Sequence, residues 1–153
     1  MQFLWLPADE RRLVVEATCW VSLARLALLT LPFRWIAPRL GRHVGESAEG
    51  LGDRDRERAQ QVVRAVTRAS RYVQEGRDCL IRAMAAMAML RRRGQGCTLY
   101  LGVRKQDDGQ LSAHAWLRIG DLHVTGGRLH ADYAVVSRFT TPGIGKTRSG
   151  SVV

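Results

Sequence analysis

Hydrophobic positions in the first half of the chain recur at helical spacing. Apolar residues repeat every three or four positions over residues 8–31 and again over residues 55–74. Because residues three and four apart share one face of a helix, each stripe predicts an amphipathic helix. Pro32 ends the first stripe, and a Gly-, Glu- and Asp-rich loop is expected at residues 43–54.

A further apolar run predicts another helix. It extends from Cys79 to Leu90, with Asp78 in place to cap its N-terminus and Gly94 to end it. A polar turn is expected at residues 74–77, just before this helix. Cys79 should therefore lie in the first helical turn.

After Gly96 the hydrophobic period changes from helical to two, which is typical of strands. The alternation predicts three strands joined by two turns. These are residues 98–104, 111–119 and 122–125, with turns at 106–110 and 120–121. Helices followed by an antiparallel meander indicate an α+β fold, with the Cys79 helix packed on a small antiparallel sheet.

Three regions are expected along the chain. Residues 1–50 form an N-terminal helical region that contacts a partner or a membrane surface, residues 51–139 form the core, and residues 140–153 form a polar, flexible tail. The apolar stretch between residues 13 and 31 contains one acidic and one basic residue. These charges favour a packed or membrane-surface helix over a spanning one.

Charge and cysteine content narrow the function. The 24 Lys and Arg residues against 14 Asp and Glu give a formal net charge of +10, which favours acidic partners or reflects a general preference for arginine. No basic block or nucleic-acid-binding signature is present, so no nucleic acid is expected. The three cysteines form no C-x-x-C motif, and residues 1–5 lack the basic start of a signal peptide, with charged residues following at 9–12. These features predict a reduced, cytoplasmic protein.

Cys79 and His114 are the residues that suggest chemistry. A cysteine in the first turn lies at the positive end of the helix dipole, which favours the nucleophilic thiolate. A histidine on a later strand supplies the base that such a nucleophile needs. The alternative is that Cys79 is a small apolar residue that begins a core helix.

Strand alternation places His114 on the less apolar face of its strand. A two-residue turn at residues 120–121 puts Ala115 and Leu117 on one face and His114 with Trp116 on the other. Trp116 is then a candidate for the wall of a substrate cleft, with ordinary packing as the alternative.

The group that would orient the imidazole is less clearly marked. The same pairing puts Gly127 opposite His114, where no carboxylate lies. Asp132 from the following segment ranks first as the third catalytic group, ahead of Thr125 or a backbone carbonyl. On the hairpin His114 and His123 are about 13 Å apart at ~3.3 Å per residue, so neither a metal nor another cofactor is expected.

Five blocks of sequence around these residues resemble the lasso-peptide B2 proteins. They are Cys79-Leu80-Ile81-Arg82-Ala83, Leu90-Arg91-Arg92-Arg93-Gly94, Leu101-Gly102-Val103-Arg104-Lys105, Ala113-His114-Ala115-Trp116-Leu117 and Val124-Thr125-Gly126-Gly127. The N-terminal part is also similar, at Glu16-Ala17, Ala24-Arg25, Leu31-Pro32-Phe33-Arg34 and Leu40-Gly41-Arg42. The resemblance covers residues 8–140 and is carried by the order of the blocks.

The resemblance implies a leader peptidase with a transglutaminase-like or papain-like core. Cys79 would be the nucleophile and His114 the general base, and they would remove the leader from a ribosomally synthesised lasso-peptide precursor. A separate B1-type leader-recognition protein would deliver the precursor, and a lasso cyclase would close the macrolactam on the released core peptide. The family's acidic third residue falls about twelve positions after the histidine, where this chain has Gly126.

Two other functions remain open at this point. The first is a non-enzymatic module that binds a peptide or protein through its basic helical surface. The second is an acyl transferase of the same superfamily. The leader peptidase and these two alternatives would each leave the precursor in a different state, so the products distinguish the three functions.

Overall fold

The computed structural model describes residues 7–42, 51–72 and 78–143, apart from the side chains of Tyr72 and Asp78. The predicted turn at residues 74–77, most of the predicted loop at 43–54 and most of the predicted tail lie outside these ranges. The helical elements are α1 (Ala8–Thr30), α2 (Phe33–Leu40), α3 (Asp53–Ala69), η2 (Ser70–Tyr72), α4 (Asp78–Arg92) and η3 (His130–Asp132). The strands are β1 (Cys97–Lys105), β2 (Leu111–Ile119), β3 (Leu122–Thr125) and β4 (Ala134–Thr141).

The predicted helices are confirmed, with shifted ends. α3 begins two residues earlier than expected, at Asp53, whose carboxylate lies in the first turn with that of Asp55. Acidic groups there interact favourably with the positive end of the helix dipole. Pro32 separates α1 from α2, and α2 buries Ile36 and Leu40.

The sheet has the strand order β3-β2-β1-β4, and its three strand pairs are antiparallel. The predicted meander β1-β2-β3 is confirmed, but the sequence did not indicate β4. β4 forms the edge of the sheet opposite β3 and pairs with β1, with Thr140 opposite Thr98 and Thr141 opposite Cys97. The predicted tail was therefore wrong at its first two residues, because their backbones complete a ladder.

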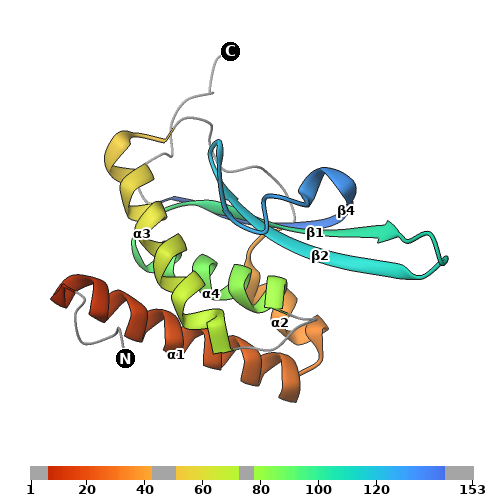
Figure 1. The fold of residues 1–153 in the computed structure, drawn as a ribbon, viewed down its shortest axis with the longest axis horizontal. Coiled ribbons are helices and arrows are strands. Elements are labelled where there is room, and N and C mark those ends of the chain that lie inside the picture. The colour runs from red at the N-terminus through yellow and green to blue at the C-terminus, as the bar shows by residue number, and fades with distance from the viewer. Residues whose placement is uncertain (1–6, 43–50, 73–77, 144–153) are drawn as a thin grey trace, which may run out of the picture.

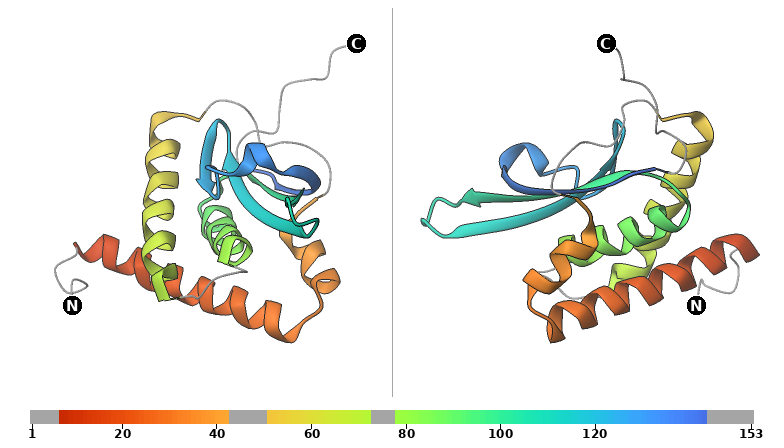
Figure 2. Two further views of the ribbon diagram at one scale, coloured as in Figure 1. Left: turned by 45° about the vertical axis from the view of Figure 1, so that its right-hand side comes forward. Right: turned by 180° about the vertical axis from the view of Figure 1, so that it is seen from behind.

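The two faces of the sheet are covered differently. The helices lie together on one side of the sheet, and the β1-β2 hairpin extends beyond them (Figure 1). The chain leaves β3 at one edge and reaches β4 at the other, so residues 126–133 cross the opposite face. Figure 2 shows the turn η3 on that side, away from α4.

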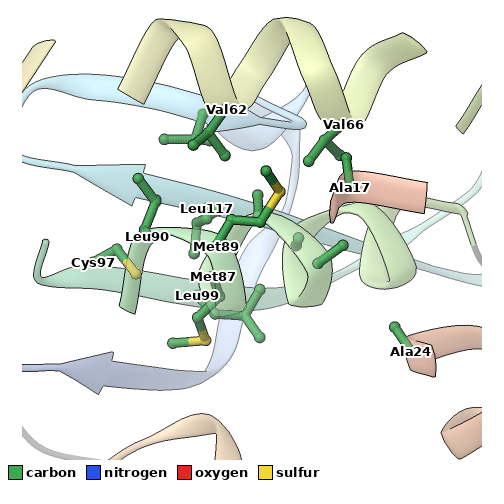
Figure 3. Packing of buried hydrophobic residues seen from close by; sticks show 14 of the residues in the cluster. Ala17, Ala24, Val62, Val66, Met87, Met89, Leu90, Cys97, Leu99 and Leu117 are labelled. Carbon is green, nitrogen blue, oxygen red and sulfur yellow. The ribbon is translucent and has the colours of Figure 1, made fainter. Parts of the chain in front are cut away.

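The core lies between α4, the sheet and two other helices. Met87, Met89 and Leu90 of α4 are fully buried against Leu99 of β1 and Leu117 of β2 (Figure 3). The remaining sides of α4 meet α1 and α3, which contribute Ala17, Val62 and Val66 to the same cluster. Small alanines on α4 allow this close approach, and burial of this apolar surface is the main stabilising term of the fold.

Candidate active site

Cys79 lies in the first turn of α4, as predicted, because the helix begins at Asp78. Its side chain is half-buried and packs against the hydrophobic core. The first backbone N–H groups of a helix have no partner within it, so a negative charge is stabilised there. The position suits a thiolate, or an oxyanion formed next to it.

His114 projects from β2 on the face that α4 does not cover. It lies opposite Gly102, and Trp116 lies opposite Tyr100. The neighbouring Ala115 is buried in the helix-covered core. The predicted division of β2 into an aliphatic face and a histidine-bearing face is confirmed.

Trp116 lies flat against the sheet on the face that carries His114. The indole is stacked on the Tyr100 ring at 5.4 Å between centroids, and it lies 5.9 Å from the His114 ring. A Cβ at Gly102 would meet the indole at 2.8 Å, so a glycine there lets the ring lie flat on β1. Only 4% of Trp116 is exposed, and its role as a substrate contact stays a prediction.

The backbone carbonyl of Gly126 holds the imidazole of His114. Nε2 lies 2.9 Å from this oxygen. Since a carbonyl only accepts hydrogen bonds, Nε2 carries the proton and Nδ1 keeps its lone pair in the neutral ring. The sequence had placed Gly127 opposite His114. That register was wrong, because an irregularity between Leu117 and Arg118 of β2 puts Thr125, the last residue of β3, opposite Leu117, and β3 ends before it reaches His114.

Glycine is required at position 126 by both conformation and space. Gly126 has φ = 67°, in the left-handed region that side chains rarely adopt. A Cβ would lie 2.6 Å from the Ala115 oxygen and 2.9 Å from Nε2 of His114. The close approach that makes the hydrogen bond therefore excludes a side chain.

Tyr133 closes the other side of His114, a contact that sequence reasoning missed. The two ring centroids are 5.1 Å apart, and the Tyr133 hydroxyl shares a hydrogen bond of 3.1 Å with Ser112. The guanidinium of Arg104 lies over the tyrosine ring, 5.1 Å from its centroid. Only the unexpected strand β4 brings Tyr133 back over β2, so no local pattern could have indicated it.

Asp132 lies beside this cluster, but its carboxylate faces a cation. Its Oδ2 is 3.8 Å from Nη1 of Arg104, and both side chains are largely exposed. Among the described residues no carboxylate is hydrogen-bonded to His114. The assignment of Asp132 as third catalytic group stays a prediction.

Cys79 and His114 belong to elements that contact each other, but they lie on different sides of the sheet. α4 covers the face that carries Leu117, whereas His114 packs with Trp116 and Tyr133 on the other face. In the described part of the chain no hydrogen bond joins the thiol to the imidazole. A direct pairing of these two residues stays a prediction.

Two further histidines meet on the same face as His114. The rings of His123 and His130 are 4.3 Å apart, and Nδ1 of His130 is 2.6 Å from the Gly127 oxygen. Burial, then the nearby His130 and Arg118, lower the pKa of His123. The described residues contain no group of three or more metal-ligating side chains.

Cys97 is a thiol of a different kind. It is fully buried in the core, and burial raises its pKa to about 11, against a smaller opposing effect of the Thr141 hydroxyl. A thiol with this pKa is not a nucleophile at neutral pH. Of the three free cysteines only Cys79 lies at the start of a helix.

One comparison with known proteins identifies the family. The sequence profile of the transglutaminase-like superfamily matches residues 27–138, which include Cys79 and His114. No curated protein and no solved structure matches the chain. The match covers more than half of the 153 residues, and the helices with a four-stranded antiparallel sheet agree with such a core. The chain therefore belongs to the transglutaminase-like superfamily, whose members are usually cysteine-dependent enzymes.

Proposed function

We propose that this protein is a cysteine peptidase that removes the leader from a ribosomally synthesised lasso-peptide precursor. The observation that carries the proposal is the hydrogen bond from His114 to the Gly126 carbonyl, 2.9 Å long. It leaves Nδ1 as the basic nitrogen of a superfamily histidine. Cys79 supplies the thiol from the first turn of α4. The family match supports the reaction class, and the ordered sequence blocks support the substrate.

The proposed mechanism has two stages. The mechanism requires a movement that brings Nδ1 of His114 within hydrogen-bond distance of the Cys79 thiol. Nδ1 then accepts the thiol proton, and the thiolate attacks the scissile carbonyl. The tetrahedral intermediate collapses to a thioester while the imidazolium gives its proton to the departing amine. Water, deprotonated by the same imidazole, then hydrolyses the thioester and regenerates the thiol. The Cys79 backbone N–H would stabilise the oxyanion.

The Gly126 carbonyl would replace the acidic third group of the family. A carbonyl fixes the tautomer and the ring orientation as a carboxylate does, but it has no full charge to stabilise the imidazolium. We therefore expect slower turnover than with a carboxylate. If Asp132 contributes, its negative charge would stabilise the imidazolium of His114 from nearby. It would not orient the ring through a hydrogen bond to Nε2.

Other proteins would complete the reaction. The described N-terminal part is helical, so we assign leader recognition to a separate B1-type protein and macrolactam formation to a lasso cyclase. All three cysteines are free, which agrees with a reducing, cytoplasmic setting. The genes beside this one provide a direct check, since a short precursor, a recognition protein and a cyclase should be among them.

Cleavage of that precursor tests the proposal. The protein, the precursor and the recognition protein are mixed, and products are identified by mass spectrometry. Cys79→Ala and His114→Ala should each abolish leader removal while circular dichroism remains native. Cys19→Ala, a matched control at an exposed cysteine of α1, should retain full activity. Cleavage by the Cys79→Ala protein would refute the assignment of Cys79 as the nucleophile.

The position of His114 favours one second candidate, a binding module without catalysis. Because Cys79 and His114 lie on different sides of the sheet, a chain that only binds the leader needs no movement of either. It would bind precursor with unchanged affinity after Cys79→Ala and form no product.

Acyl transfer within the same superfamily is separated from hydrolysis by adding a primary amine, since only a transferase gives the amide product.

A further inference from the structure

α1 has an uncovered apolar side. Its packed side carries Val14, Ala17, Val21 and Ala24, which are buried against the rest of the fold. The outward side carries large exposed hydrophobic residues, and two more exposed ones follow before and within α2. These exposed residues, called here the leucine ridge, are Leu23, Leu26, Leu29, Leu31 and Trp35.

The leucine ridge is too large to be ordinary surface. Leu29 is 67% exposed and Trp35 is 57% exposed, although large apolar side chains usually pack inside. Contiguous exposed apolar patches mark interaction sites. The ridge lies at the far end of α1 from the acidic residues Asp9 and Glu10.

The charge around the ridge has one sign. Residues 17–42 contain four arginines and no aspartate or glutamate. Three of these arginines, Arg25, Arg34 and Arg39, are exposed beside the ridge. Long basic side chains at the rim of an apolar strip, with a tryptophan at its end, match the interface of an anionic lipid bilayer.

We propose that the leucine ridge rests on an anionic membrane surface, with α1 lying in the plane of the interface. By length and composition α1 would also suffice to span a bilayer. Its buried side argues against that arrangement, because Val14 to Ala24 already pack on α3 and α4. The outward side of a helix is convex, which suits a lipid surface better than the groove that usually holds a peptide. The ridge is on the outward side of α1, and Cys79 packs against the core, so this proposal does not depend on the peptidase reaction.

Vesicle sedimentation of the full chain tests the proposal. We expect binding to vesicles that contain phosphatidylglycerol, little binding to pure phosphatidylcholine, and weaker binding as salt is raised. The double variant Leu26→Glu/Leu29→Glu should bind at least about tenfold more weakly, since it removes apolar contact and adds repulsion. Leu111→Glu is the matched control, because Leu111 is 75% exposed on the β1-β2 hairpin, far from the ridge.

The result has a clear reading in each case. Binding that the ridge variant loses and the Leu111→Glu control keeps supports the proposal. No binding to the anionic vesicles, or equal binding by both variants, overturns it. Analytical ultracentrifugation of the same proteins covers the other occupant: self-association that the ridge variant abolishes, without vesicle binding, would make the ridge a protein interface.

Discussion

The two faces of the sheet differ in chemistry as well as in cover. The face beneath α4 is aliphatic and closed, and it carries Leu99 and Leu117 without exposed surface. The other face holds rings and histidines that are bound to backbone carbonyls, as His114 is to Gly126. One face thus provides the folding energy, and the other holds titratable groups in fixed orientations. A substitution should therefore reduce stability on the first face and alter chemistry on the second.

The largest effect on stability is expected on the closed face. Leu117→Ala should lower the free energy of unfolding by about 3 kcal/mol, because it leaves a cavity under α4. His114→Ala on the other face loses one hydrogen bond and ring contacts, so it should cost about 1 kcal/mol. Urea denaturation measures both, with Leu111→Ala as an exposed control near zero. Equal losses for Leu117→Ala and His114→Ala would remove the distinction between the faces.

A smaller effect is expected at the carbonyl that holds His114. Gly126→Ala should cost about 2 kcal/mol, since it combines a left-handed backbone with a clash against the Ala115 oxygen. Gly109→Ala is the matched control. Gly109 also has positive φ, 83°, but has open space around its Cβ, so it should cost only about 1 kcal/mol.

Nuclear magnetic resonance sharpens the same comparison. The Nε2 proton of His114 should be protected from exchange in the wild type and in Gly109→Ala, and should lose that protection in Gly126→Ala. Unchanged protection in Gly126→Ala would mean that the carbonyl does not orient the ring.

The smallest effect concerns pH. Burial lowers the pKa of His123, so the unfolded chain takes up a proton at higher pH than the folded one. Stability should therefore fall as the pH drops below about 6.5, the ordinary pKa of histidine. His123→Gln should flatten this slope. Glu16, whose pKa is lowered chiefly by a hydrogen bond from Arg93, acts in a separate window below the usual 4.5. An identical slope in His123→Gln would assign the pH dependence to other groups.

Periodicity predicted most elements because each signal was local. The helical stripe of α1, the first-turn position of Cys79 and the turn at residues 106–110 each follow from neighbouring residues. The facing of His114 followed from strand alternation in the same way. The transglutaminase-like superfamily was also predicted correctly, and its profile matches residues 27–138, whereas the lasso-peptide B2 family stays a prediction.

What the sequence did not reveal depends on contacts between distant segments. β4 pairs with β1, although β2 and β3 lie between these two strands in the sequence. Its hydrophobic alternation is weak because several of its residues are exposed. Without β4 there was no reason to place Tyr133 against His114. The irregularity between Leu117 and Arg118 of β2 likewise ended the simple register that the sequence predicts, and the Gly126 carbonyl reaches His114 only because the chain turns back over the sheet after β3.

We infer that Cys79, on the helix-covered side of the sheet, and His114, on the other side, act as one unit. The most direct test is the rate at which iodoacetamide modifies Cys79 at neutral pH, measured by peptide mass spectrometry. Exposed Cys19 and buried Cys97 in the same molecule serve as internal references. We predict that Cys79 reacts faster than Cys19 in the wild type and loses this advantage in His114→Ala. The same rate in both proteins would show that the imidazole does not reach the thiol, and would contradict the peptidase proposal.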